Sequence, residues 1–431
     1  MNARGAKRQT LLLTVVNTFV RALGLYMRVH LSRLLGAEIM GIAELCAGVH
    51  LLAITPLTSG LPLAISRMTA KAEEESRNMP LLAGILLVRK VSLFLIPALL
   101  LVSPLLAGLM RDQRVLPSLW MTAPCILILG YSAVYNGYCY GIEKSWIPSV
   151  SELIEQVARF ALSIGLVMLL TKLTTPWLAA VPVFATMVAE ILGLFYVLWL
   201  IKVPTRDISR AKEWQKPVFH LAAPTTLIRL INTGLRSLTA ILVPLRLQAS
   251  GLASAEATAR LGMLNGMVMP IVLLPCIFTS ALSMVALPRL AKAEQDRAAL
   301  KRMLLLCFGA AAWVGLVSWA VIHLLASVLA NWAYRLPELA ELFRFCGPLV
   351  LLSALGHIAS GVIAALGQQK RSMYGALATS AATLVLTYGL TALPSYRLLG
   401  AILAQILGQG TMLLWNLVIL WKGLHRRKDK S

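Results

Sequence analysis

Long apolar stretches separated by short polar breaks run through almost the whole of this 431-residue chain. A helix needs about 20 apolar residues to cross the hydrocarbon core of a bilayer, and stretches of that length recur throughout the sequence. We therefore predict an all-α polytopic membrane protein with twelve transmembrane helices. The helices are expected near residues 10–32, 38–64, 91–109, 116–140, 149–171, 176–201, 218–245, 258–286, 303–330, 343–366, 373–393 and 398–421.

A shorter apolar segment, MPLLAGILLVRK at residues 79–90, precedes the third predicted helix. It is too short to cross the bilayer by itself and it ends in Arg89 and Lys90. We predict that this segment approaches the membrane along the interface.

Composition supports a membrane location. Hydrophobic residues make up 58% of the chain and charged residues 13%, and the mean hydropathy is +0.77, which excludes an ordinary soluble globule. The six cysteines lie singly, without a CxxC pair, which argues against a zinc site or a disulfide framework. The basic start, MNARGAKRQT, is followed by no small-residue cleavage site, so we expect an uncleaved cytoplasmic tail.

The net charge of +22 is explained better by membrane topology than by binding to nucleic acid. Lys and Arg concentrate in the cytoplasmic loops of membrane proteins. They are frequent here in the central loop and in the tail, at Arg206, Arg210, Lys212, Lys216, Arg426, Arg427, Lys428 and Lys430. This bias predicts an even number of helices with both termini cytoplasmic.

The longest polar interruption, KVPTRDISRAKEWQKP at residues 202–217, divides the predicted helices into two groups of six. TFVRALGLYMR at 18–28 aligns with TLIRLINTGLR at 226–236, and both arginines of each segment coincide. SRMTAKAEE then resembles PRLAKAEQ, and GIEK resembles GQQK, in the same order. We predict a parallel-topology repeat with a cavity between two lobes, 1–206 and 207–431.

Arginines occur inside predicted helices of both halves, Arg21 and Arg28 in the first, Arg229 and Arg236 in the second. An arginine at the centre of a membrane helix costs about 2.5–3.5 kcal/mol. The members of each pair are close to two helical turns apart, so they share one face of their helix. A face turned toward a water-filled cavity would remove most of this cost.

A cavity lined by these cations would prefer an anion, and the planar guanidinium group can donate two hydrogen bonds to one phosphate. The alternative for Arg28 and Arg236 is that their side chains extend to the membrane interface. Arg21 and Arg229 are predicted to lie deeper, which makes them the stronger candidates for a contact with substrate.

Polar side chains gather on the predicted fifth helix, in the sequence SELIEQVARF. Glu152, Glu155, Gln156 and Arg159 are three or four residues apart, so they share a face and Glu152 or Glu155 can pair with Arg159. This helix-five cluster either braces the helix bundle or contacts substrate.

Glu44 and Glu190 stand alone in apolar stretches. Either carboxylate could carry a proton or bind Na⁺ and so couple transport to an ion gradient, and Glu44 could instead neutralise a neighbouring arginine. We expect no other cofactor and no resident metal.

Several segments resemble one family of membrane proteins. SRLLGAEIMGIAEL, GLPLAISRMTAKAE and, above all, NGYCYGIEKSWIPSVSELIEQVARF at 136–160 are similar to the stage V sporulation protein B branch of the polysaccharide-biosynthesis transporters. That branch belongs to the multidrug/oligosaccharidyl-lipid/polysaccharide superfamily, together with MurJ-like lipid II flippases, Wzx O-antigen flippases and MATE drug exporters. The resemblance covers nearly the whole chain.

The resemblance implies two six-helix lobes, alternating access and transport of undecaprenyl-pyrophosphate-linked oligosaccharide or peptidoglycan precursor from the cytoplasmic to the outer leaflet. It implies a monomer in the bacterial plasma membrane, with a role in polysaccharide, cell-wall or spore biogenesis. It also implies a contact between the first-helix arginines Arg21 and Arg28 and the substrate pyrophosphate. MurJ-like relatives use two additional helices to hold the lipid tail, whereas twelve helices are expected here.

Two other functions remain open from the sequence. A MATE-type antiporter for drugs or cations would have the same fold but usually needs carboxylates in its cavity, and the intrahelical arginines argue against it. A membrane-embedded glycosyltransferase would need acidic catalytic residues and a large outer loop. Walker, Rossmann and HExxH motifs do not occur in the sequence, so the expected function is transport rather than nucleotide hydrolysis or metal-dependent catalysis.

Overall fold

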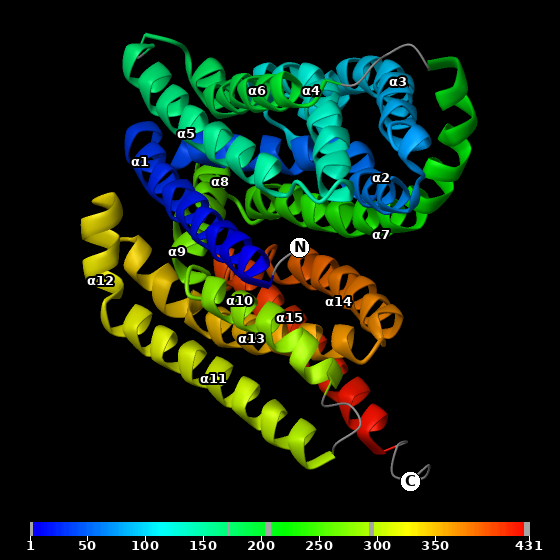
Figure 1. Cartoon of the computed structure of the whole chain (residues 1–431). Helices are drawn as coiled ribbons and strands as arrows, with labels where there is room; N and C mark the ends of the chain where they lie inside the picture. The colour runs from blue at the N-terminus through cyan, green and yellow to red at the C-terminus, as the bar shows by residue number, and fades with distance from the viewer. Residues whose placement is uncertain (1–2, 171, 203–207, 293–296, 426–431) are drawn as a thin grey trace. The chain divides into compact units, whose positions relative to one another are not determined.

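The regular structure of the described residues is entirely helical, as the apolar pattern predicts. The computed structural model describes residues 3–170, 172–202, 208–292 and 297–425 (Figure 1). By its internal contacts the chain divides into two compact units, Met1–Ser237 and Leu238–Ser431. The lobe boundary expected at 206/207 lies outside the described residues and stays a prediction.

The first unit contains six helices and the first part of a seventh. They are α1 (Ala3–Thr58), α2 (Gly60–Lys71), α3 (Met79–Met110), α4 (Leu116–Gly141), α5 (Trp146–Leu169), α6 (Thr175–Leu200) and the start of α7 (Ile208–Ala249), with short 3₁₀ turns η1 (Glu74–Ser76) and η2 (Gln113–Val115). Gly36, at φ 75°, breaks α1 between the first and second predicted spans. This left-handed conformation favours glycine, which has no Cβ.

The second unit continues from the end of α7 and contains longer helices joined by short ones. They are α8 (Ser254–Leu261), the π-helix η4 (Gly262–Val268), α9 (Met269–Val272), α10 (Cys276–Lys292), α11 (Arg297–Leu324), α12 (Ala326–Leu329), the π-helix η6 (Ala330–Tyr334), α13 (Leu339–Ala365), α14 (Gln369–Leu390) and α15 (Leu398–His425).

Nine helical stretches of the described chain are long and apolar enough to cross a membrane. A tenth consists of the segment from α8 to α9 together with α10, and the two parts meet at a bend of 55°. One of the nine, Thr18–Lys71, covers two predicted spans because of the break at Gly36. The remaining predicted span is α5, which is helical but carries the charged residues of the helix-five cluster. The chain is therefore a multi-pass membrane protein. The twelve predicted spans are largely helical, and three of them, 38–64, 258–286 and 303–330, cross a break between helices.

Two segments extend neighbouring helices, and they contact each other. Residues 79–90 form the first turns of α3, and their expected position along the membrane interface stays a prediction, whereas residues 208–217, expected in the central loop, begin α7. Buried Met79 and Leu82 pack against Ala211 in one apolar cluster, with Trp214 against it. Burial of this shared surface stabilises both helical extensions, and hydropathy along one segment cannot reveal such a contact.

The helix starts repeat with a constant spacing. Helices α4, α5 and α6 begin at Leu116, Trp146 and Thr175, and helices α13, α14 and α15 begin 223 residues later, at Leu339, Gln369 and Leu398. The backbone repeats as well, because α3 is followed by Arg111 at φ 54° and η6 is followed by Arg335 at φ 55°. This spacing is what two copies of one helical unit would produce.

Close packing of α4 against α2 depends on small residues. A Cβ atom at Gly137 would lie 2.6 Å from the carbonyl oxygen of Pro62, which is closer than atoms in contact normally approach. Gly165 in α5 provides a contrast, because a Cβ there would meet no atom within 4 Å.

We predict that Gly137→Ala destabilises the protein by about 1–3 kcal/mol, because the added methyl group forces α4 away from α2. Gly165→Ala should leave stability unchanged or raise it by up to about 1 kcal/mol, since alanine is the better helix former. Thermal unfolding of the purified variants in detergent measures both effects. Equal melting temperatures for the two variants would contradict the packing described here.

Candidate functional site

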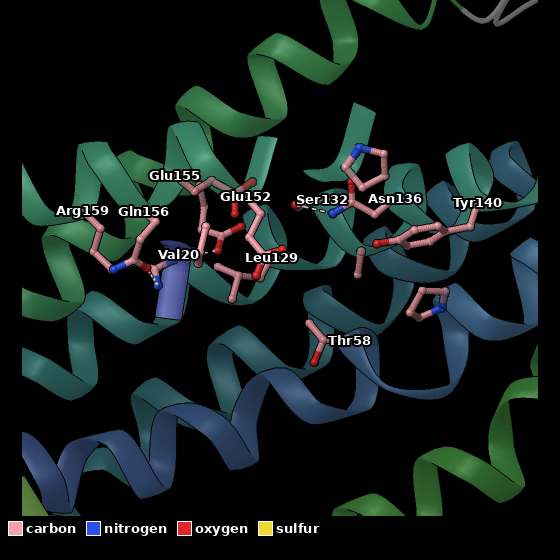
Figure 2. Close-up of a pocket in the computed structure, with 14 residues that line it drawn as sticks. Val20, Thr58, Leu129, Ser132, Asn136, Tyr140, Glu152, Glu155, Gln156 and Arg159 are labelled. Carbon is pink, nitrogen blue, oxygen red and sulfur yellow. Dashed lines mark hydrogen bonds and ion pairs between the residues drawn. The ribbon is translucent and has the colours of Figure 1, made fainter. Parts of the chain in front are cut away.

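A cavity of about 400 Å³ lies among the helices of the first unit (Figure 2). Its wall is formed by side chains of α1, α2, α4, α5 and α6. Most of the polar side chains in the wall come from three of these helices, and they are Ser132, Asn136, Tyr140, Glu152, Glu155, Gln156, Arg159 and Glu190. The volume lies within the range of about 300–1,000 Å³ that is typical of small-molecule sites.

Helix α5 brings the whole helix-five cluster to this cavity. Glu152, Glu155, Gln156 and Arg159 all line it, as expected for residues three or four apart on one helical face. Glu155 and Gln156 are only 8% and 6% exposed, whereas Glu152 is exposed. The prediction that these four side chains share one face of the helix is therefore confirmed. Their role stays a prediction.

The ion pair at the cavity differs from the one expected. Arg159 pairs with Glu190 of α6, at 3.3 Å between Nη2 and Oε1, instead of with Glu152 or Glu155 of its own helix. Its Nη1 also donates to Oε1 of Gln156 at 3.5 Å. Glu155 is held by another group, because Ser151 Oγ donates a hydrogen bond of 2.7 Å to its carboxylate.

The carboxylate of Glu155 fits against α6 because that helix has a glycine at the contact. A Cβ atom at Gly193 would overlap the Glu155 carboxylate. Helix α6 therefore contributes both a charged partner, Glu190, and the space that a second carboxylate occupies.

Three further residues of the wall come from α4 and were not assigned a role from the sequence. Ser132, Asn136 and Tyr140 are four residues apart, so they form one polar stripe along α4. Asn136 Nδ2 donates to Ser132 Oγ at 3.5 Å. The four-residue spacing of polar residues is the signal that could have identified them.

Three buried polar atoms in the wall have no hydrogen-bond partner among the described residues. They are Asn136 Oδ1, Gln156 Nε2 and Arg159 Nε. Leaving a buried donor or acceptor unsatisfied costs about 1–3 kcal/mol, and native proteins contain few such groups.

The cavity is acidic, which was not expected in so basic a chain. Three glutamates and one arginine line it, so it carries a net negative charge when all four are ionised. Within the described residues, no three His, Cys, Asp or Glu side chains are placed to hold a metal ion.

Four polar residues of the wall have apolar counterparts in the second unit. At the spacing of 223 residues, the positions that correspond to Asn136, Glu155, Arg159 and Glu190 lie on α13, α14 and α15 of the second unit. These positions carry Ala359, Ala378, Ala382 and Leu413. Because the corresponding helices form with apolar residues at these four positions, the helices themselves do not require the four polar side chains.

The four arginines predicted to bind pyrophosphate do not line this cavity. Arg28 forms an ion pair with Glu44 within α1, so Glu44 does neutralise a neighbouring arginine. Arg21 on α1 and Arg229 and Arg236 on α7 have exposed side chains. Their contact with substrate, and ion coupling by Glu44 or Glu190, stay predictions.

Comparison with known proteins connects this chain to one group of transporters. The model of a family described as polysaccharide biosynthesis protein matches residues 6–294. Stage V sporulation protein B of Bacillus subtilis (strain 168) is 26% identical over 424 residues, which cover 93% of this chain and 80% of that protein.

Two solved structures have a similar fold. Lipid II flippase MurJ in an inward closed conformation gives a TM-score of 0.77 at 16% identity, covering 96% of this chain and 89% of that one. An inward-facing multidrug resistance MATE family transporter of the MOP superfamily gives a TM-score of 0.69 at 15% identity, covering 96% and 98%. At such identities the similarity shows the fold alone.

The Arg159–Glu190 pair generates a prediction about stability. Arg159→Met should destabilise the protein by about 3–5 kcal/mol, because it leaves the Glu190 carboxylate buried without its cation. The double variant Arg159→Met/Glu190→Met should recover part of that loss, since both charges are then removed. Thermal unfolding in detergent gives the comparison.

The control is Arg260→Met in the second unit. Arg260 pairs with Glu256 and Glu338, at 3.5 Å each, and these side chains are exposed. Its loss should cost less than about 1 kcal/mol. Strictly additive effects of the two substitutions at Arg159 and Glu190 would show that the buried pair is not energetically coupled.

Proposed function

This chain belongs to the polysaccharide biosynthesis protein family, and from that membership we propose that it is a flippase for a lipid-linked glycan. Its substrate is an undecaprenyl-pyrophosphate-linked oligosaccharide or a lipid II-like peptidoglycan precursor. The protein carries the headgroup from the cytoplasmic to the outer leaflet by alternating access. Similarity to a sporulation protein and to a lipid II flippase supports a substrate of this class.

The observation that carries the proposal is a set of intrahelical arginines that have no acidic partner among the described residues. Arg21, Arg229 and Arg236 have exposed side chains on largely apolar helices, and none forms an ion pair within the described part of the chain. In a bilayer such groups need water or an anionic ligand. A pyrophosphate suits them, because each guanidinium group can donate two parallel hydrogen bonds to phosphate oxygens.

Arg28 differs from the other three arginines because it already has an acidic partner. Its guanidinium group already pairs with Glu44, so a pyrophosphate would have to compete with that carboxylate. Glu190 also has a partner, Arg159, but it lines the cavity, and it is the carboxylate that we assign to coupling with Na⁺ or H⁺.

The proposal places the protein in the bacterial plasma membrane as a monomer with cytoplasmic termini. A membrane potential that is positive outside favours outward movement of an anionic headgroup by about 2.3 kcal/mol per charge per 100 mV. The potential, an ion gradient or consumption of the product would therefore drive transport.

One observation favours a second function, which is export of organic cations. The cavity of the first unit contains Glu152, Glu155 and Glu190 against the single Arg159, and an acidic pocket attracts cations. The fold is compatible with this activity, since a MATE family transporter has a similar structure.

Reconstituted vesicles can separate the two functions. We predict that the protein exposes the headgroup of labelled lipid II, or of another undecaprenyl-pyrophosphate-linked glycan, to a probe on the opposite face of the membrane. Vesicles without protein provide the background rate. If the protein exported organic cations and every glycan lipid crossed only at the background rate, the antiporter would replace the flippase as the proposed function.

Substitution of the arginines tests the proposed substrate contact. Arg21→Ala and Arg229→Ala should each abolish headgroup translocation without loss of expression, because they remove a cation that binds the pyrophosphate. Arg302→Ala, at an exposed position of α11, is the matched control and should translocate at the normal rate. Normal rates for both Arg21→Ala and Arg229→Ala would show that these residues do not hold the substrate.

A further inference from the structure

The unsatisfied polar atoms of the first-unit cavity indicate that its natural occupant is a ligand with both donors and acceptors. Gln156 is 6% exposed, and its Nε2 has no acceptor among the described residues. Arg159 Nε also lacks an acceptor, and Asn136 Oδ1 lacks a donor. All three residues line the cavity. Their unpaired atoms are buried, so a group bound there can complete their hydrogen bonds once the side chains turn toward it.

The charges in the wall exclude a simple ion as the best occupant. A bare phosphate would be repelled by the carboxylates of Glu152, Glu155 and Glu190. A cation would be attracted to these carboxylates, but it would leave the N–H groups of Gln156 and Arg159 without acceptors. A hydroxyl group satisfies both requirements, because it donates to a carboxylate or amide oxygen and accepts from an N–H group.

The remaining features of the wall fit a ligand that carries several hydroxyl groups. Glu152 has an exposed carboxylate at the cavity with no hydrogen bond or ion pair in the described structure, so it is available to accept from a ligand. Tyr140 adds an aromatic ring with a hydroxyl group to the same wall (Figure 2). The cavity, of about 400 Å³, has room for a small polar group such as a sugar ring but not for a whole lipid-linked glycan.

We propose that the first-unit cavity is a subsite for the sugar hydroxyls of the transported glycan, formed by Asn136 and Tyr140 of α4, Glu152 and Gln156 of α5, and the Arg159–Glu190 pair. The proposal rests on the proposed flippase function and assigns the two parts of the substrate to different residues. The exposed arginines bind the pyrophosphate, and the acidic cavity distinguishes a glycan from a bare lipid pyrophosphate. In the second unit, Asn136, Tyr140, Arg159 and Glu190 have the apolar counterparts Ala359, Ile363, Ala382 and Leu413 at the spacing of 223 residues.

The affinity of the full-length protein for two lipids, measured in nanodiscs, tests whether the arginines and the cavity bind different parts of the substrate. The probes are undecaprenyl pyrophosphate whose terminal phosphate carries either a methyl ester, here called the bare lipid, or a neutral disaccharide, so that both are pyrophosphate diesters of equal charge and differ in hydroxyl groups. The wild-type protein should bind the disaccharide-bearing lipid more tightly. Gln156→Leu and Glu152→Gln should each reduce this preference about three- to tenfold, which is the usual effect of losing one or two hydrogen bonds, and should leave affinity for the bare lipid unchanged.

Two controls carry the same substitutions at exposed positions outside the cavity, Gln113→Leu in η2 and Glu75→Gln in η1. Both should keep the wild-type preference. Glu152 is exposed, so Glu152→Gln preserves the fold even if Gln156→Leu does not.

The outcomes separate the inference from the proposed function. An unchanged preference in Glu152→Gln and in folded Gln156→Leu would overturn the sugar subsite while leaving the flippase intact. If the wild-type protein bound the organic cation tetraphenylphosphonium, and Glu152→Gln lost this binding but kept the lipid preference, the cavity would be a cation site. A wild-type protein that binds neither lipid would overturn the proposed function itself.

Discussion

A charged group inside hydrocarbon must be paired or hydrated, and the first unit is arranged around this requirement. Among the arginines of its long helices, Arg28 pairs with Glu44 and Arg159 pairs with Glu190. Each pair connects separate helical segments, the two parts of α1 on either side of Gly36 in one case and α5 with α6 in the other. Arg21, Arg229 and Arg236, which form no ion pair within the described residues, are therefore the groups that need a ligand or water.

This arrangement separates two kinds of chemistry within one unit. Exposed guanidinium groups lie on α1 and α7, whereas α4, α5 and α6 surround an acidic cavity with unsatisfied amide atoms. A lipid-linked glycan also has two parts, an anionic pyrophosphate and neutral hydroxyl groups. Under the proposed function, this correspondence would account for the three glutamates that line the cavity of a strongly basic chain.

Local sequence pattern predicts much of this structure, and it fails where contacts between distant segments decide the outcome. The length of the apolar runs locates the spans, and three- or four-residue spacing places Glu152 and Arg159 on one face. The pairing of Arg159 with Glu190 depends on how α5 packs against α6, which no local pattern specifies. Likewise, the helical extensions at 79–90 and 208–217 depend on each other.

Photocrosslinking with a glycan lipid that carries a diazirine on its sugar tests the central claim most directly. The account predicts that the sugar label attaches to the cavity segments of α4, α5 and α6, within residues 132–140, 152–159 and 186–193, and that an unlabelled disaccharide-bearing lipid competes. Labelling outside these segments would contradict it. So would labelling that an organic cation competes away while the unlabelled glycan lipid has no effect.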